Sequence, residues 1–244
     1  MPELGPGAWI GTAGWSIPKQ HAHAFPGTGS HLERYARILP AVEINSSFYR
    51  AHRPATYARW AASVPPGFRF AVKVSRTVTH ERRLVDAVEP LTRFLDEAVA
   101  LGRALGPLLV QLPPSLRYDE AVVGRFLDLL RGQFAGEVVC EPRHASWFTR
   151  TAETCLSAFR VARVAADPAV VPGAAVPGGW TGLVYIRLHG SPDTYRSAYP
   201  SEALERTAWR LRVALKEGQT CWCIFDNTAL GEASGNALDL SNRL

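Results

Sequence analysis

The chain has 244 residues, of which 47% are hydrophobic and 20% are charged, and this composition excludes a disordered or fibrous protein. Its length is sufficient for one α/β barrel, a domain that typically needs about 250 residues. The net charge of +5 and a pI near 9.2 moderately favour anionic partners such as phosphates or nucleic acid.

The compartment is predicted from segments that the sequence lacks. No stretch approaches the roughly 18 apolar residues that a membrane-spanning helix requires. The first residues, Met1-Pro-Glu-Leu-Gly-Pro-Gly, contain no basic segment followed by an apolar one, so we expect no secretory signal. Four scattered cysteines do not form a disulfide framework. We therefore expect a cytoplasmic protein that has no membrane partner.

Eight short runs rich in Val, Ile and Phe recur along the chain and are typical of strands. They are Ala8 to Thr12, Ala41 to Ser46, Phe68 to Val74, Pro107 to Leu112, Glu137 to Glu141, Val161 to Ala166, Leu183 to His189, and Thr220 to Asp226. Because helical segments separate most of them, the order predicts βα units and a parallel sheet.

The intervening segments place apolar residues three and four positions apart, as helices do. They are Leu32 to Leu39, Ala55 to Ala62, Leu91 to Leu105, Glu120 to Leu130, Ala152 to Phe159, Glu202 to Leu215, and Ala233 to Leu240. Boundary residues support them: Pro54 and Pro90 suit a first turn, Asp119 and Ser201 suit an N-cap, and Gly106 and Gly218 suit a helix end.

One unit departs from the pattern. Between the sixth and seventh runs, the segment from Pro168 to Gly179 is too rich in proline and glycine for a long helix. We therefore predict an irregular TIM-like (β/α) barrel of the α/β class, formed by residues 1–244 as a single domain. Eight strands are expected, with a missing or short helix between the sixth and seventh.

Alternation within the runs predicts which side chains face the barrel interior, because residues two apart share a face of a strand. Val42 and Ile44 alternate with Glu43 and Asn45, and similar alternation separates apolar from polar residues in the third and seventh runs. The polar sets should face inward. The same parity directs Cys221 and Cys223 toward the helices, so we do not expect this pair to bind a metal.

Polar residues also occur at the ends of the other runs, where they include Gln111, Glu141, Arg143, Asp167 and Asp226. Catalytic residues of (β/α) barrels lie at the carboxyl ends of the strands. The sequence therefore predicts a site there.

Several motifs of this chain resemble those of the YecE-like family of uncharacterised proteins, known as domain of unknown function 72. The resemblance runs in order from Ile10 to Leu240 and rests on Gly11-Thr-Ala-Gly-Trp-Ser-Ile-Pro, Val42-Glu-Ile-Asn-Ser-Ser-Phe-Tyr, Phe70-Ala-Val-Lys-Val-Ser-Arg-Thr-Val-Thr-His, Leu109-Val-Gln-Leu-Pro-Pro, Glu141-Pro-Arg-His-Ala-Ser-Trp-Phe, Tyr185-Ile-Arg-Leu-His-Gly and Phe225-Asp-Asn-Thr. It implies a TIM-barrel-like fold and no particular activity.

We expect the cations of the site to bind an anionic substrate, because arginine pairs well with phosphate and carboxylate oxygens. These cations are Lys73, Arg76, Arg143 and Arg187. Glu141 or Glu43 is the expected base and His189 or His80 the expected acid. The further substrate-binding candidates are Trp15, Asn45, Tyr49, Gln111, His144, Asp226 and Asn227, of which Trp15 and Tyr49 could stack on a sugar or base.

Two other interpretations concern the charged residues themselves. Glu43 could pair with Lys73, and Glu141 with Arg187, since buried charges are usually paired. Alternatively, a divalent metal could bind to Glu43, Glu141, His189 and Asp226, which supply oxygen and nitrogen ligands on different strands.

The hypothesis with most support is an enzyme that acts on an anionic, phosphate-bearing substrate, such as nucleic acid, a nucleotide or a sugar phosphate. Hydrolysis is the favoured reaction. The alternatives are a nucleic-acid-binding module without catalysis and a metal-dependent sugar isomerase.

Overall fold

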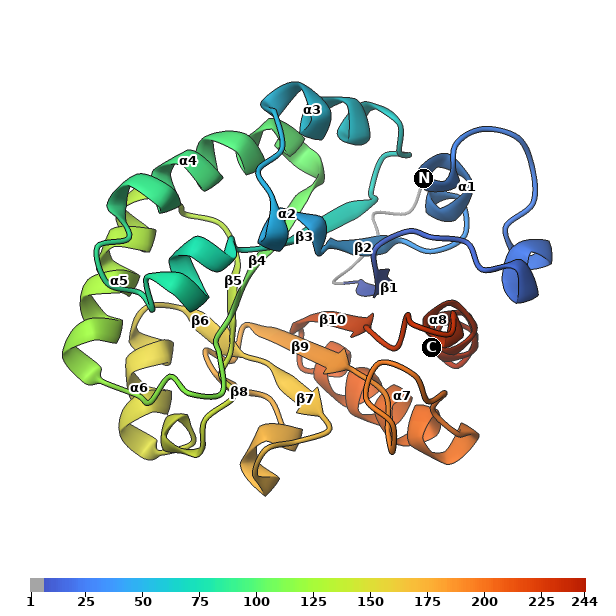
Figure 1. Cartoon of the computed structure of the whole chain (residues 1–244). Helices are drawn as coiled ribbons and strands as arrows, with labels where there is room; N and C mark the ends of the chain where they lie inside the picture. Colours follow the sequence, from blue (N-terminus) through green and yellow to red (C-terminus); the bar gives the residue numbers. More distant parts are fainter. Residues whose placement is uncertain (1–6) are drawn as a thin grey trace.

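Ten strands form a single, nearly closed, barrel-shaped sheet in the computed structural model, which describes residues 7–244 (Figure 1). The segment inspected for a secretory signal falls almost entirely outside these residues. The strand order is β7-β9-β10-β1-β2-β3-β4-β5-β6-β8, and every pairing is parallel except that of β8. The strands are β1 (Ala8–Ala13), β2 (Ala41–Ile44), β3 (Arg69–Lys73), β4 (Leu105–Gln111), β5 (Val138–Glu141), β6 (Val161–Arg163), β7 (Ala165–Asp167), β8 (Gly178–Gly179), β9 (Leu183–Leu188) and β10 (Thr220–Phe225).

The difference between eight expected strands and ten observed ones arises at the sixth run. This run breaks at Val164 into β6, which pairs with β5, and β7, which pairs with β9. The N–H of Val164 still donates to the carbonyl of Cys140 at 2.9 Å. The chain thus passes from one neighbouring strand to the other within seven residues. The short β8 adds an antiparallel pair at β6.

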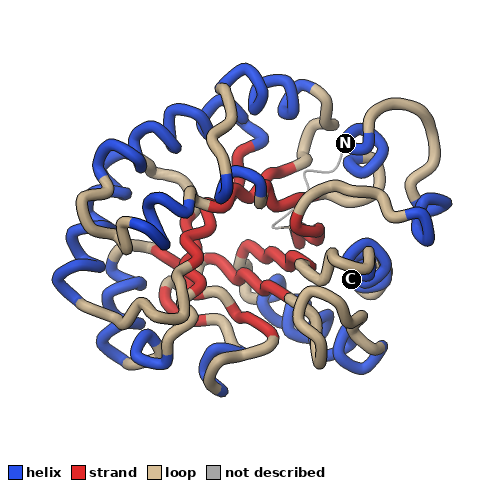
Figure 2. Tube along the Cα trace, viewed as in Figure 1, coloured by secondary structure: helices blue, strands red, loops and turns tan. Residues whose placement is uncertain are grey.

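Helices surround the sheet, as Figure 2 shows, and the predicted irregular TIM-like barrel is confirmed. They are α1 (His31–Ala36), α2 (Ser46–Tyr49), α3 (Pro54–Ala62), α4 (Val88–Ala98), α5 (Glu120–Gln133), α6 (Arg150–Ala158), α7 (Ser201–Lys216) and α8 (Glu232–Ser241). The predicted gap between the sixth and seventh runs is also confirmed, because it holds only a short 3-10 helix, Pro172–Ala175, and β8.

The helix boundaries follow local chemistry. Pro54 begins α3, and Asp119 caps α5 by accepting a hydrogen bond from the N–H of Val122 at 3.0 Å. Gly218 follows α7 with a φ of 76°, which suits glycine. Two boundary predictions are wrong: Ser201 lies inside α7 without capping it, and Gly106 lies in β4.

Two apolar layers pack on either side of the sheet. The outer layer fills the space between strands and helices, and it includes Cys221 and Cys223 as predicted. The inner layer fills the lower lumen with side chains such as Leu109, Val139 and Ile224, and Trp222 stacks between Trp9 and Tyr185 there. The polar side chains therefore lie above a filled lumen, toward the carboxyl ends of the strands.

Within residues 7–244, no helix combines the length and the apolar character needed to cross a bilayer.

Candidate functional site

Seven polar side chains converge in the upper lumen from six different strand ends. This group, the polar ring, consists of Glu43, Lys73, Gln111, Glu141, Arg187, His189 and Asp226. Strand parity directs all of them inward, as the sequence predicts, and all except Gln111 are buried. Three carboxylates and two basic side chains of the ring thus share a small, dry volume with a histidine and an amide.

Arg187 is the centre of the polar ring and is 0% exposed. Its Nε donates to Glu43 Oε2 at 2.9 Å and its Nη2 to Glu43 Oε1 at 2.5 Å. Its Nη1 lies 3.3 Å from Glu141 Oε2, and its Nη2 lies 3.1 Å from Asp226 Oδ2. The hydroxyl of Tyr185 donates to Glu43 at 3.0 Å. The guanidinium of Arg187 therefore holds three carboxylates in place.

His189 contacts a carboxylate through each ring nitrogen. Its Nδ1 lies 3.0 Å from Asp226 Oδ2, and its Nε2 lies 2.9 Å from Glu141 Oε1. The Nη2 of Arg143 lies 2.6 Å from the same Nε2 and 2.6 Å from Glu141 Oε1. A protonated Nε2 can donate to Glu141, whereas an unprotonated one can accept from Arg143. Each ring nitrogen of His189 thus has a neighbour with which a proton can be exchanged, as general acid–base catalysis requires.

The cations around the two carboxylates keep them ionised. Burial alone would raise the pKa of Glu141, but the positive charges of His189 and Arg187 outweigh it and hold this pKa well below its usual range. For Asp226, burial is likewise outweighed by Arg187 and by the hydrogen bond from His189, so that its pKa is also lowered. Both side chains are therefore ionised at neutral pH.

The rim above these groups contains polar atoms whose hydrogen bonding is incomplete. Arg143 retains a side-chain exposure of 17%, and its buried Nε has no partner among the described residues. The buried Oδ1 of Asn45 likewise has none within residues 7–244. Gln111 donates to Glu141 Oε2 at 3.1 Å. Because buried polar atoms are normally paired, Asn45 and Arg143 are the rim residues with spare capacity for a ligand.

Lys73 does not form the ion pair with Glu43 that the sequence suggested. Its Nζ lies 4.1 Å from the centre of the Phe48 ring and forms no ion pair or hydrogen bond with any residue that the structure describes. Burial, followed by the positive charge of Arg187, lowers the pKa of Lys73 to about 8, against the opposing effect of Glu43.

Four candidates have structural partners elsewhere. Trp15 packs against Trp60 and Phe70 on the helix side of the sheet. His144 accepts from the N–H of Ser146 and caps a 3-10 turn. Asn227 is fully buried and donates to the carbonyl of Ser197 and to Asn236. The Oδ1 of Asp167 accepts from the hydroxyl of Tyr199 at 2.8 Å, outside the polar ring. These four side chains therefore have partners outside the polar ring, although the buried Oδ1 of Asn227 has none among the described residues.

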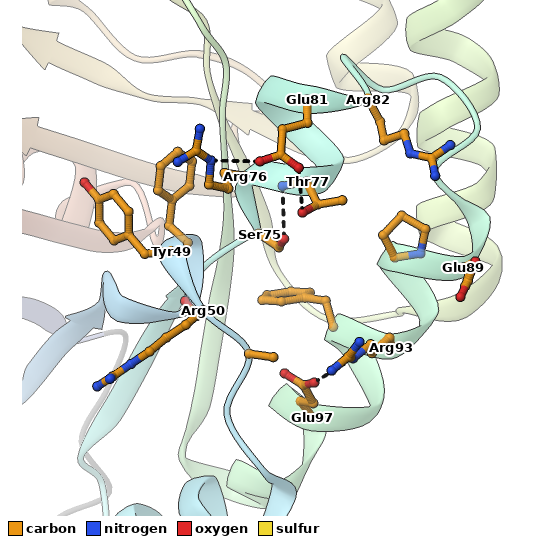
Figure 3. Close-up of a pocket in the computed structure, with 15 residues that line it drawn as sticks. Tyr49, Arg50, Ser75, Arg76, Thr77, Glu81, Arg82, Glu89, Arg93 and Glu97 are labelled. Atoms are coloured by element: carbon orange, nitrogen blue, oxygen red, sulfur yellow. Dashed lines mark hydrogen bonds and ion pairs between the residues drawn. The ribbon is translucent and has the colours of Figure 1, made fainter.

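Two further candidates, Arg76 and Tyr49, line a cavity shown in Figure 3, and a third, His80, packs against Phe48 in its wall. This arginine-lined cavity has a volume of about 360 Å³, and its charged lining residues are Arg50, Arg76, Arg82, Arg93, Glu81, Glu89 and Glu97. Arg76 pairs with Glu81 at 3.0 Å, and Tyr49 is 67% exposed at the edge. The ring of His80 packs against the ring of Phe48, with 4.8 Å between the ring centroids.

Burial, followed by the charge of Lys73, lowers the pKa of His80. His80 is thus separated from Lys73 by the ring of Phe48, which contacts both. Phe48 therefore divides the polar ring from the arginine-lined cavity, and of the candidates only Arg76 and Tyr49 line the latter.

Three neighbours of the site were not among the residues selected from the sequence as catalytic or substrate-binding. Tyr185 shares the inward parity of Arg187, and that parity is the signal by which it could have been found. Phe48 follows the second strand closely, but its position under Lys73 depends on the fold. The ring of Tyr195 packs edge-on against that of His189, with 5.8 Å between the centroids, and the backbone of Tyr195 has a φ of 68°. No local pattern indicated Tyr195.

The proposed metal ligands do not form a metal site in the described residues. No group of three or more His, Cys, Asp or Glu side chains between residues 7 and 244 is arranged to bind a metal ion. Arg187 occupies oxygens of Glu43, Glu141 and Asp226, and each nitrogen of His189 faces a carboxylate. The donor set does not fit a divalent cation, because guanidinium groups occupy the places between the ligands.

Comparison with known families and proteins agrees with this fold. The model of the family described as "Protein of unknown function DUF72" matches residues 9–244. The UPF0759 protein YecE of Escherichia coli K12 is 32% identical over 146 residues, which cover 59% of this chain and only 52% of YecE. The matched region therefore spans about half the length of that relative. The UPF0759 protein YunF of Bacillus subtilis is 24% identical over 93% of this chain and 91% of its own.

Solved structures show the same architecture. A DUF72 family protein from Enterococcus faecalis has a TM-score of 0.82 at 23% identity, covering 98% of this chain and 95% of its own. A DUF72 family protein from Thermotoga maritima has a TM-score of 0.76 at 23% identity, covering 96% of this chain and 98% of its own. At this identity the likeness shows the fold alone, so the chemistry must be argued from the side chains.

Proposed function

Because this chain belongs to the DUF72 family, whose description assigns no reaction, we propose its function from the polar ring: the protein is an enzyme that binds a small anionic, phosphate-bearing substrate at the barrel mouth and transfers protons through His189 and Glu141. Hydrolysis of a phosphate ester is the reaction to test first, with Glu141 accepting a proton from water and His189 returning one to the leaving group.

The observation that carries this proposal is the fully buried His189 with a carboxylate at each nitrogen. Burying so many charges is costly, and apolar side chains would fill the lumen with a smaller desolvation penalty. The lower lumen of this protein is filled in that way by Leu109, Val139 and Ile224. The change from an apolar to an ionic interior at the strand ends therefore supports a catalytic role for the upper layer.

The rim supplies the groups for the anion. Lys73 and Arg143 are cations with donors that the described residues leave available, whereas the unpaired amide oxygen of Asn45 can accept a hydrogen bond from a hydroxyl of the substrate. An anionic oxygen bound between the two cations would give Arg143 the partner that its Nε lacks. In this proposal the rim binds the substrate, and the layer beneath it transfers protons.

Turnover on a panel of phosphate esters tests the proposal. We would assay the purified protein for phosphate release from a nucleotide, a sugar phosphate and a short single-stranded DNA, with magnesium, manganese or zinc. We expect turnover that falls about 100-fold or more in Glu141→Gln and in His189→Ala. Glu205→Gln, a surface variant that alters only exposed ion pairs, should retain it. Absence of turnover on every substrate and metal would contradict the enzymatic function.

A second candidate, nucleic-acid binding without catalysis, is favoured by the arginine-lined cavity and by Tyr49 at its edge. Arginines would contact phosphates and the exposed tyrosine would stack on a base. Binding of this kind should weaken steeply with salt and should be lost in Arg50→Ala combined with Arg82→Ala, while Glu141→Gln leaves it unchanged. Affinity measurements at two salt concentrations separate the two functions. A metal-dependent isomerase has no support from the ring, since arginines occupy the candidate ligands.

A further inference from the structure

Lysine is rare in this chain, and one of its few lysines is buried in the polar ring. Of the 27 basic residues, 24 are arginine, and the three lysines are Lys19, Lys73 and Lys216. Lys19 and Lys216 are exposed, whereas Lys73 is 5% exposed. A guanidinium remains protonated at any pH that a protein experiences, but an amine can lose its proton and react. The use of lysine at this position therefore points to the chemistry of the amine.

The surroundings of Lys73 leave its amine available. Its Nζ lies over the Phe48 ring at 4.1 Å, and the ring carboxylates are engaged by other cations. A lysine in a purely structural role would be expected to pair with one of them, since an unpaired buried charge is costly. Within residues 7–244 no side chain takes this role for Lys73. The aromatic face holds the amine without consuming its hydrogen-bonding capacity.

Burial also makes this amine easier to deprotonate than an ordinary lysine. Burial, with the charge of Arg187, lowers the pKa of Lys73 to about 8, so that a useful fraction of the amine carries a free electron pair near neutral pH. A lysine of ordinary pKa would be almost entirely protonated there.

We propose that Lys73 is a nucleophile that forms an imine with the carbonyl carbon of a small aldehyde or ketone bearing a phosphate group. This inference rests on the anion binding of the proposed function, because the same rim would hold the phosphate, and it goes beyond that function by naming a carbonyl substrate and a reaction other than ester hydrolysis. The electron pair of Nζ forms the carbon–nitrogen bond, and the carbonyl oxygen is protonated to a hydroxyl. Nitrogen then loses a proton, the hydroxyl takes one and leaves as water, and a carbon–nitrogen double bond remains.

The neighbouring acid–base groups suit the chemistry of such an imine. A protonated imine withdraws electrons from the adjacent carbon and makes its proton easier to remove. Glu141 and His189 form the ring's proton-transfer pair, with 2.9 Å between Oε1 and Nε2. Removal of a proton beside the imine carbon is therefore the reaction that this combination supports.

Pyridoxal 5′-phosphate, an aldehyde that carries a phosphate, is a direct probe of Lys73. We would incubate the full chain with limiting probe, reduce any imine with borohydride, and locate the label by peptide mass spectrometry. We expect Lys73 to be labelled at about tenfold lower probe concentration than Lys19 and Lys216, which serve as controls within the same chain. Excess inorganic phosphate should protect Lys73 alone, and labelling should increase as the pH rises toward 8.

The variant Lys73→Arg keeps the charge and removes the amine, so it should lose the selective label while the two exposed lysines react as before. Labelling of Lys73 no faster than of Lys19 and Lys216 would overturn the inference, and this comparison needs no variant. The two proposals fail separately. An unlabelled Lys73 with phosphate ester turnover that depends on His189 refutes the imine but leaves the proposed function intact. A selectively labelled Lys73 without turnover of any phosphate ester retains the nucleophile and refutes the hydrolase.

Discussion

The polar ring and the arginine-lined cavity use the same kinds of side chain in opposite ways. In the ring, Arg187 is 0% exposed and contacts Glu43, Glu141 and Asp226 at once. In the cavity, Arg76 and Glu81 are each 50% exposed and form a single pair. Exposed pairs contribute little to stability, whereas breaking a buried one leaves a desolvated charge. Burial, and not the number of charges, therefore decides how much a substitution lowers the free energy of unfolding.

The largest effect is expected when the central cation of the ring is removed. Arg187→Met leaves three carboxylates without their shared partner and should lower the free energy of unfolding by about 3–5 kcal/mol. Chemical denaturation measures this value. Arg93→Met is the matched control, because Arg93 is 74% exposed beside Glu97. Equal losses in the two variants would refute the distinction between the regions.

Acid should destabilise the protein through the ring. The pKa values of Glu141 and Asp226 are lowered in the folded state, where cations outweigh the effect of burial. Their stabilisation is therefore complete above the unfolded values, roughly 4, and is lost as the pH falls through the lower folded values. Urea unfolding from pH 7 to pH 2.5 should show this loss. Asp226→Asn should flatten the dependence below pH 4, and an unchanged slope would count against the assignment.

A smaller effect is expected from removing one hydrogen bond beneath the ring. Tyr185→Phe keeps the aromatic stack with Trp222 but deletes the donor to Glu43 Oε2. Loss of a buried partner of this kind typically costs about 1–3 kcal/mol. Thermal unfolding of the variant would provide the value. A gain in stability would mean that Glu43 needs no donor besides Arg187.

The smallest effect belongs to the cavity. Glu81→Gln removes the partner of Arg76, and we expect a change below about 0.5 kcal/mol because both side chains are half exposed. The midpoint of urea unfolding tests this. A loss above about 1 kcal/mol would show that the cavity contributes to stability as the ring does, and the contrast would no longer hold.

The facing of the ring residues could be predicted from sequence, and so could the pair of Glu141 with Arg187, but the partner of Glu43 could not. Alternation is a property of every strand, so Glu43, Glu141 and Arg187 were directed inward without knowledge of the fold. Their pairing depends on which side chains reach across the lumen. Glu43 pairs with Arg187 of β9, 144 positions away, and not with Lys73 of the adjacent β3. Adjacency of strands was therefore a poor guide to contacts between long side chains.

Loop residues were predicted less well than strand residues, for a related reason. Trp15 and His144 follow strand ends, as site residues often do, but each has a partner outside the polar ring. Trp15 packs against Trp60, and His144 caps the turn that follows it. Tyr195 reaches His189 only because a long loop folds back over the barrel. The spacing of apolar residues in the sequence does not indicate where a loop brings a side chain back to the site.

The break at Val164 has a consequence for how the cylinder could be opened. The strands β6 and β7 are two parts of one run and are connected by the chain at Val164. Strand β5 is hydrogen-bonded to β6, and strand β9 is hydrogen-bonded to β7. A circular permutant with its new termini at residues 163 and 164 would convert the cylinder into an open sheet with two free margins.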